Sequence, residues 1–346
     1  MILYGGSYTE DVGPGLFGTG KGIYCFDFNE TTGALKLLHV FLGRNTSYIA
    51  ISNNKKYLFS FEEVSKDKKP VVLSFIINKD YSLKLINQQS IEGGLPCHLN
   101  LVNDVTLGVV CYETGSTHLY PINKDGSLEP TSQTINNVGT SVNVERQECA
   151  HSHMIESNGN QIFVPDLGID KVVVYNLKEN KLIEDYKISI PLGEGPRHIV
   201  FHPLGKLGFV INELTGGVSI LKKENSKFKV VETVSSLPEN YEETPSAAGI
   251  KMSSDGKFLY VSNRGGNTIA VFNFNIENEK LTLLDQKDSG GETPRDFTIS
   301  PNEKWLIVSN QDSNNITVFK RDLNAIKLTE VFKIKTAESI VCLKFL

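Results

Sequence analysis

Short apolar runs recur along the whole chain and define its organisation. They are four to seven residues long, rich in β-branched and aromatic residues, and bounded by Gly, Asn, Asp and Pro. No long segment carries the 3.6-residue period of an amphipathic helix. This pattern predicts an all-β protein with little helix.

The apolar runs belong to a repeated unit, seen most clearly in residues 196–221, 254–272 and 294–319. In each unit an apolar second strand ends in a polar residue, and a turn leads to an alternating third strand. A short first strand precedes them and a fourth follows, as in residues 280–284. First strands are expected near Thr46, Pro96, Ala150, Pro196, Ser246, Pro294 and Ala337. Seven starts at intervals of about fifty residues favour the four-stranded blades of a propeller.

The two ends of the chain complete the seventh unit. The last unit stops after one strand, residues 340–345, whereas the chain begins with what resembles a second strand, residues 1–8. The sequence therefore predicts a seven-bladed β-propeller of four-stranded antiparallel blades, closed by the C-terminal strand joining three N-terminal strands. Closure removes exposed sheet edges that would otherwise aggregate. No linker or shift in composition divides the 346 residues, so we expect a single domain, 1–346.

Composition narrows the class of partner. The net charge of -5 shows no bias toward nucleic acid or an anionic membrane surface. The five cysteines are odd in number and form no CxxC pair, so neither a disulfide framework nor a zinc site is expected. The N-terminus lacks a basic segment followed by a long apolar stretch, and no window has the ~18 apolar residues of a membrane span. We expect a cytoplasmic protein; its oligomeric state stays open.

Polar residues at two repeat positions identify the expected site. The first strand begins, and the second ends, at the same end of an antiparallel blade, so these positions converge near the axis. First-strand starts contribute His98, His151, Arg197 and Arg295. Second-strand ends contribute Glu63, Glu113, Glu213, Arg264 and Gln311. Arginine suits phosphate and carboxylate, and a histidine or glutamate can activate water, so this set favours hydrolysis of an anionic ester or lactone.

Less specific interpretations stay open for individual residues. Glu213 is as well explained by a structural ion pair with Arg197 or Arg264 as by catalysis. Cys149 near His151 suggests a thiol nucleophile only weakly, because no third group is identifiable. The glycine-rich residues 13–20 precede no helix, which favours a connecting loop over a phosphate-binding loop.

Several of these motifs resemble the lactonase-type seven-bladed propellers. This family contains the propeller form of 6-phosphogluconolactonase and the fungal carboxymuconate-lactonising enzymes. The resemblance rests on Pro196-Arg197-His198 with Phe201-His202-Pro203, Asn212-Glu213, residues 255–272, Pro294-Arg295, residues 4–9 and residues 151–168. It implies a catalytic set of His151, Arg197, Glu213 and Arg264. The additional His153 leaves open which imidazole faces the channel.

The resulting hypothesis is hydrolysis of 6-phosphogluconolactone in the oxidative pentose phosphate route. Arg264 and Arg295 would bind the phosphate, Glu213 or His151 would be the base, and Arg197 would stabilise the oxyanion. His153, His198 and Gln311 complete the expected substrate contacts. No metal or organic cofactor is expected, since no acidic cluster matches the calcium site of six-bladed lactonases. The alternatives are a lyase or isomerase acting on a muconate-type dicarboxylate, and a non-catalytic binding propeller.

Overall fold

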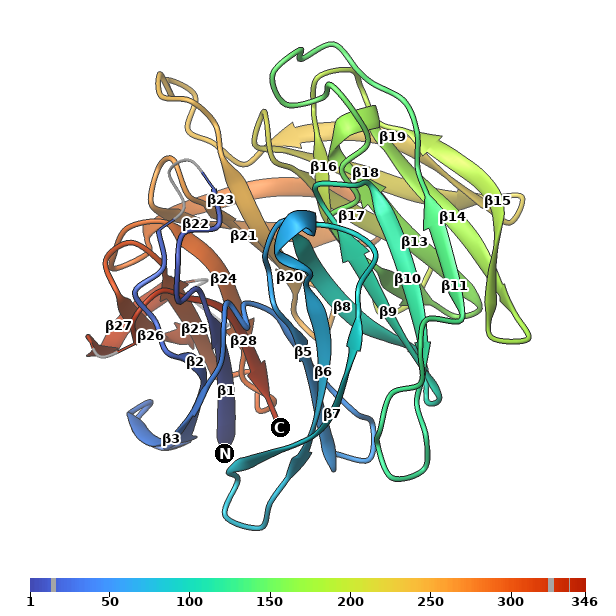
Figure 1. Ribbon diagram of the computed structural model, residues 1–346. Helices are drawn as coiled ribbons and strands as arrows, with labels where there is room; N and C mark the ends of the chain where they lie inside the picture. The colour runs from blue at the N-terminus through green and yellow to red at the C-terminus, as the bar shows by residue number, and fades with distance from the viewer. Residues whose placement is uncertain (14–16, 323–326, 336) are drawn as a thin grey trace.

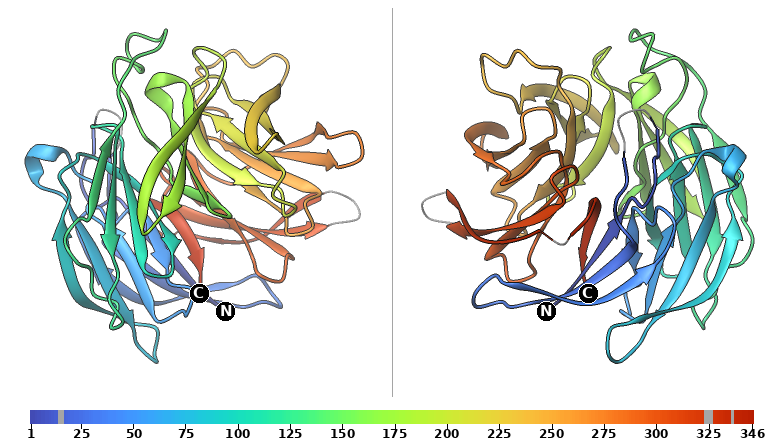
Figure 2. Two further views of the ribbon diagram at one scale, coloured as in Figure 1. Left: turned by 90° about the vertical axis from the view of Figure 1, so that its right-hand side faces the viewer. Right: turned by 60° about the vertical axis from the view of Figure 1, so that its left-hand side comes forward.

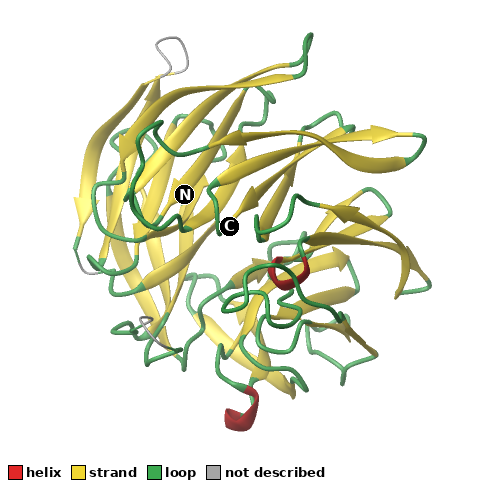
Figure 3. Cartoon of the chain, turned by 90° about the horizontal axis from the view of Figure 1, so that it is seen from above, coloured by secondary structure: helices red, strands yellow, loops and turns green. Residues whose placement is uncertain are grey.

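Seven four-stranded antiparallel sheets surround a common axis in the computed structural model (Figure 1). The structure describes residues 1–13, 17–322, 327–335 and 337–346. Within these residues helix is confined to two short 3₁₀ turns, η1 (Lys66–Lys68) and η2 (Leu167–Ile169), as the view from above shows (Figure 3). The predicted all-β propeller of seven blades is confirmed.

The blades are numbered in chain order, and each is given from its first to its fourth strand. Blade 1 contains β4 (Ile49–Ile51), β5 (Tyr57–Phe61), β6 (Val71–Ile77) and β7 (Leu83–Ser90). Blade 2 contains β8 (Pro96–Asn103), β9 (Thr106–Cys111), β10 (Ser116–Pro121) and β11 (Gln133–Asn136). Blade 3 contains β12 (Glu156–Asn158), β13 (Gln161–Asp166), β14 (Lys171–Lys178) and β15 (Lys181–Ser189). Blade 4 contains β16 (Pro196–Phe201), β17 (Leu207–Asn212), β18 (Gly217–Glu224) and β19 (Lys227–Ser235).

The remaining blades lead back to the start of the chain. Blade 5 contains β20 (Ala247–Met252), β21 (Phe258–Asn263), β22 (Thr268–Asn275) and β23 (Lys280–Asp288). Blade 6 contains β24 (Pro294–Ile299), β25 (Trp305–Asn310), β26 (Asn315–Asp322) and β27 (Lys327–Ile334). Blade 7 contains β28 (Ile340–Phe345), β1 (Ile2–Ser7), β2 (Gly22–Phe28) and β3 (Leu35–Leu42).

Blade 7 closes the ring as predicted. Strand β28 pairs antiparallel with β1, with Leu3 opposite Phe345 and Gly5 opposite Leu343. The two termini consequently lie side by side at one end of the molecule (Figures 1 and 2). Strand β2, and no helix, follows the glycine-rich segment, whose residues 14–16 lie outside the described part of the chain. That the chain is one domain stays a prediction.

Burial follows the position of a strand within its blade. The second strands β17, β21 and β25 are buried at every residue, because neighbouring blades pack against both of their faces. Between blades 4 and 5, for example, Phe209 and Ile220 pack in one apolar cluster with Leu259 and Phe272. The outermost strand β19 alternates between exposed and partly or fully buried positions. None of the helices in the described residues could span a membrane.

The same polar contact positions blade 4 on blade 3 and blade 6 on blade 5. Asp170 and Asn267 adopt left-handed conformations (φ 49° and 52°) in the turn between second and third strands, where Asn and Asp are tolerated best among residues with a side chain. Oδ1 of Asp170 accepts a hydrogen bond from the Gly195 amide at 2.8 Å, and Oδ1 of Asn267 accepts one from the Thr293 amide at 2.8 Å. Gly195 and Thr293 directly precede β16 and β24. The starts of these first strands, where the predicted site residues lie, are therefore fixed by the preceding blade.

Blade 3 departs from the regular pattern. Its first strand, β12, begins at Glu156, six residues after the predicted start at Ala150. The preceding residues 150–155 still run beside β13, where the His153 amide donates to the Pro165 carbonyl at 2.9 Å. Pro165 has no N–H to donate in return, so the ladder is interrupted there.

Candidate active site

A cavity of about 560 Å³ lies on the face where first strands begin and second strands end. The structure brings six of the predicted rim and site residues together in its wall: Glu63, His151, His153, Glu213, Arg264 and Arg295. The other lining residues are Val12, Gly13, Leu95, Cys97, Tyr112, Glu145, Arg146, Glu148 and Ser246. Residues from all seven blades and the connections between them thus meet at one site.

Local backbone irregularity directs two of the arginines inward. The pairing of β16 with β17 shifts register between Pro196 and His198, so that Arg197 is the extra residue of a β-bulge. The pairing of β24 with β25 shifts in the same way around Arg295. A bulge turns the side chain of its extra residue away from the regular pleat. Both guanidinium groups are buried toward the axis as a result.

Glu213 lies directly after β17 and contacts three arginines. Its Oε2 is 3.0 Å from Nε of Arg197 and 3.0 Å from Nη2 of Arg264. Its Oε1 accepts a hydrogen bond of 2.6 Å from Nη2 of Arg146, which also donates to the Tyr112 hydroxyl at 3.2 Å. One buried carboxylate therefore holds three guanidinium groups, and the predicted ion pairs of Glu213 are present.

These charges determine the protonation state of Glu213. Burial alone would raise the pKa of its carboxyl group, but the charges of Arg264 and Arg197 hold that pKa well below its usual range. Glu213 is therefore ionised at neutral pH. A carboxylate stabilised this strongly is a weak base. The geometry favours Glu213 as the anchor of the arginines over its predicted role as general base.

The floor of the cavity contains a second acidic group and an arginine with an unused donor. Glu63 accepts hydrogen bonds from the Tyr8 hydroxyl at 2.9 Å and from the Ser47 hydroxyl. The guanidinium of Arg295 lies over the Tyr8 ring at 5.2 Å, and its Nη1 is buried without a hydrogen-bond partner. A buried donor without a partner is costly, so this atom is suited to an oxygen of a ligand.

The two histidines of the cavity wall differ in their contacts. Nδ1 of His151 lies 2.8 Å from the Tyr112 carbonyl and Nε2 lies 3.1 Å from Oε1 of Glu148. His153 is buried, with Nδ1 lacking a partner and Nε2 4.0 Å from Glu213. Burial, together with the charge of Arg197, lowers the pKa of His153 well below its usual range, so its ring is neutral at neutral pH.

Arg197 and His198 lie deeper than predicted. Both line a separate void of about 10 Å³ beneath the cavity, roughly the space for one water molecule. Nη1 of Arg197 donates to the Ala248 carbonyl at 2.8 Å and its Nε is paired with Glu213, so its guanidinium is engaged by the protein itself. Neither residue lines the cavity, and Arg197 lies behind Glu213. The roles of Arg197 at the oxyanion and of His198 in substrate binding stay predictions.

Two further rim residues also lie outside the cavity wall. Gln311 is buried, and its Nε2 donates to Oδ1 of Asp312 at 3.1 Å. Glu113 is exposed and accepts a hydrogen bond from the Lys66 amide at 2.9 Å. The repeat places the backbone of these residues correctly, but a nearer polar partner determines where each side chain points. The predicted substrate contact of Gln311 is not supported.

Residues 2–345 match the family described as lactonase, 7-bladed beta-propeller. The chain belongs to this family. It is 34% identical over 311 residues to a 6-phosphogluconolactonase of Bacillus subtilis, covering 87% of this chain and 86% of that protein. A solved structure of a Lactobacillus plantarum protein is 31% identical with a TM-score of 0.92, over 100% of this chain and 99% of that one. A periplasmic gluconolactonase of Pseudomonas aeruginosa is 27% identical with a TM-score of 0.91, over 100% and 98%.

Three cavity residues that contact the predicted site residues were not expected from the sequence: Tyr112, Arg146 and Glu148. Arg146 and Glu148 belong to the irregular segment between β11 and β12, which has no counterpart among the repeat positions. Their signal in the sequence is the polar run of residues 145–148 just before His151. Tyr112 directly follows β9, one residue before the polar position of that repeat.

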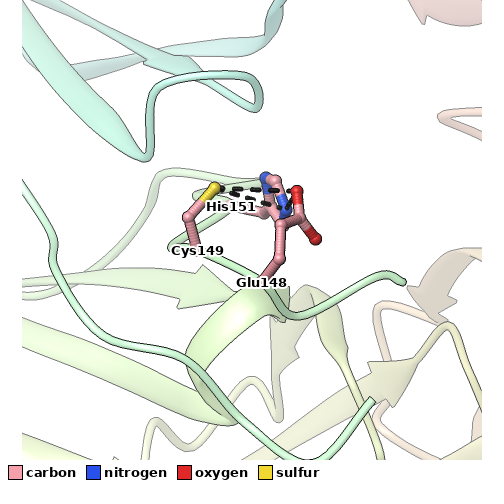
Figure 4. A group of neighbouring side chains, drawn as sticks. All are labelled: Glu148, Cys149 and His151. Carbon is pink, nitrogen blue, oxygen red and sulfur yellow. Dashed lines mark hydrogen bonds and ion pairs between the residues drawn. The ribbon is translucent and has the colours of Figure 1, made fainter. Parts of the chain in front are cut away.

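Figure 4 shows Glu148, Cys149 and His151 as neighbouring side chains. Glu148 and His151 line the cavity. The hydrogen bond between His151 and Glu148 accounts for their proximity, and the adjacent Arg146 adds positive charge. Burial and the charge of Glu148 raise the pKa of the Cys149 thiol, which disfavours a nucleophilic thiolate.

Proposed function

We propose that the protein hydrolyses 6-phosphogluconolactone to 6-phosphogluconate. The observation that carries this proposal is the convergence of four arginines in and directly behind the cavity wall. Arg146, Arg264 and Arg295 line the cavity, and Arg197 lies behind it against Glu213. Guanidinium groups are planar, permanent cations that suit the oxygens of an anionic ligand. The similarity to the B. subtilis 6-phosphogluconolactonase supports the same substrate.

The proposed reaction is addition of water followed by ring opening. Water attacks the carbonyl carbon of the lactone and transfers a proton to an imidazole, and negative charge develops on the carbonyl oxygen. Collapse of this intermediate breaks the bond between the carbonyl carbon and the ring oxygen. The imidazolium then returns the proton to the ring oxygen, which leaves a hydroxyl and a carboxylic acid. The acid releases the second proton of the water to solvent at neutral pH and becomes a carboxylate.

Arg264 and Arg295 are assigned to the oxyanion because both guanidinium groups line the cavity. Preorganised donors act most strongly where charge develops, and Glu213 holds Arg264 in place. Nη1 of Arg295 is a buried donor without a hydrogen-bond partner in the protein. Arg197 positions Glu213 from behind, which replaces its sequence-based assignment as the oxyanion donor.

His151 is assigned to proton transfer. Its ring is held through Nδ1 and the Tyr112 carbonyl, while Nε2 faces the carboxylate of Glu148 at the cavity edge. Such a fixed imidazole can accept a proton from water and return it to the leaving oxygen. His153 is the alternative base, and exchanging each histidine separately distinguishes the two.

The test is the rate of 6-phosphogluconolactone hydrolysis by purified protein above the uncatalysed rate. His151→Gln should reduce kcat by about 10²-fold or more, and His153→Gln by less. A larger loss in His153→Gln would transfer the proton-transfer role to that residue. A rate equal to background, with protein shown to be folded by circular dichroism, would overturn the proposed function.

We also propose a place in the cytoplasm, in the oxidative pentose phosphate route. All five cysteines are free thiols and four of them are buried, in keeping with a reducing compartment. The P. aeruginosa relative is named as periplasmic. Fractionation of the source cells tests this, and recovery of the protein outside the cytoplasm would contradict it.

A further inference from the structure

Arg146 differs from the other arginines of the site in how it is held. It lies on the irregular segment between blades 2 and 3, not on a bulged or terminal strand position. The segment is anchored beside it, because the buried Gln147 donates through Nε2 to the Leu167 carbonyl at 2.9 Å. The backbone is therefore fixed, while the long side chain extends over the cavity to Glu213.

Exposure separates Arg146 from its neighbours. Its side chain is 43% exposed, whereas those of Arg197 and Arg264 are 3% and 12% exposed. Oε2 of Glu213 already accepts from Arg197 and Arg264, so Glu213 keeps two guanidinium partners when Arg146 turns toward a ligand. Arg146 is thus the cation of this cluster that an entering anion meets first.

The two ends of the cavity suit different groups of a phosphorylated lactone. At the floor, Arg295 shares the cavity wall with the carboxyl groups of Glu63 and Glu213, whose negative charge disfavours a dianion there and leaves this end to the uncharged carbonyl group. At the mouth, Arg146 presents a planar guanidinium to solvent, which suits the several oxygens of a phosphate. In a sugar lactone phosphorylated on its exocyclic carbon, the carbonyl carbon and the carbon that carries the exocyclic group flank the ring oxygen. The exocyclic CH2 group extends the phosphate away from the ring, so the phosphate and the carbonyl oxygen can contact different parts of the cavity.

We propose that Arg146 binds the phosphate at the cavity mouth and thereby makes the protein prefer phosphorylated over unphosphorylated sugar lactones. The inference rests on the proposed lactone hydrolysis and changes its sequence-based form, in which Arg264 and Arg295 hold the phosphate. Arg146, which lies outside the repeat, then recognises the phosphate, and the lactone carbonyl group lies at the cavity floor near Arg295.

Steady-state kinetics of Arg146→Met on two substrates tests the inference. With 6-phosphogluconolactone we expect KM to rise about 10- to 100-fold, the loss typical of one hydrogen bond between charged groups. With unphosphorylated gluconolactone the loss in kcat/KM should be at least about five-fold smaller than with the phosphorylated lactone, because only the phosphorylated lactone loses a phosphate contact. Arg146→Lys should retain part of the preference through its point charge. The matched control is Lys222→Met. Lys222 lies on β18, away from the cavity, and the substitution removes the cation of its half-exposed ion pair with Glu279.

Equal losses on both substrates would overturn the inference, because they would mean that Arg146 acts through Glu213 on the reaction itself. An unchanged KM for the phosphorylated lactone would overturn it too. If the wild type hydrolyses neither lactone above background, the proposed function fails, and calorimetric binding of inorganic phosphate decides about Arg146. Tighter binding by the wild type than by Arg146→Met supports the phosphate site; equal binding, or none, contradicts it.

Discussion

The cavity mouth and the inner channel use polar side chains to opposite effect. At the mouth, Glu213, Arg146 and Arg264 border about 560 Å³ of open space. Beneath it, the rings of Tyr48, His98 and His198 lie close together, with centroids 4.3 Å apart for Tyr48 and His98 and 5.6 Å apart for the two histidines. About 10 Å³ of void is found there.

Protonation explains the difference. Guanidinium groups cannot lose their charge, so the mouth requires counter-charges and keeps room for an anion. Burial, assisted by neighbouring cations, lowers the pKa values of His98 and His198 well below their usual range. These rings are neutral and pack like apolar groups without a counter-charge. The same axis can therefore be open and charged at one level and sealed at the next.

Substitution of Glu213, which holds the arginines of the cavity in place, should have the largest effect on stability and activity. Glu213→Gln leaves Arg197 and Arg264 buried without their counter-charge, so we expect a loss of about 3–5 kcal/mol in unfolding free energy. The loss of fixed donors should lower kcat/KM by about 10²-fold. Urea denaturation and lactone hydrolysis measure both. Glu279→Gln, which breaks a half-exposed ion pair, is the control and should change stability by about 1 kcal/mol or less.

Acid should destabilise the inner channel next. Because the folded-state pKa values of His98, His153 and His198 are lowered, the unfolded chain binds more protons than the folded one below about pH 6.5. Stability is therefore present above this pH and is lost as the pH falls through it. Urea unfolding between pH 7.5 and 5.5 should show the decline, with His198→Gln reducing the average slope over this range by about 0.7 kcal/mol per pH unit. An unchanged slope in the variant would contradict a neutral His198.

Two buried tyrosines provide the smallest and sharpest contrast. The Tyr8 hydroxyl donates to Glu63 at the cavity floor, whereas the Tyr48 hydroxyl is buried without a partner. Tyr8→Phe should cost about 1–3 kcal/mol of stability, because the lost bond is to a carboxyl group. Tyr48→Phe should be neutral or slightly stabilising, since it removes an unsatisfied group. Thermal unfolding of the pair measures the difference, and equal effects would show that the two levels are not distinct.

Much of the fold followed from local patterns. The predicted starts at Pro96, Pro196 and Pro294 coincide with the first residues of β8, β16 and β24. Turn residues and alternation act over a few positions, so they are readable from the chain alone. The start of blade 3 was predicted least accurately, because residues 150–155 pair with a strand that contains Pro165.

The candidate site could be predicted only in part. Repeat positions correctly brought His151, Glu213, Arg264 and Arg295 to one cavity. They could not show that Arg197 lies behind Glu213, since that depends on which partners its guanidinium meets once the blades are packed.

The sequence by itself determined the number of blades, the closure of the ring and the face on which polar residues gather, because each follows from a short period repeated along the chain. Only the tertiary structure decided which of those residues share the cavity. Arg146 and Tyr112 join it because an irregular segment and a neighbouring blade meet there. Distances between side chains on different blades depend on packing, and no local pattern encodes them.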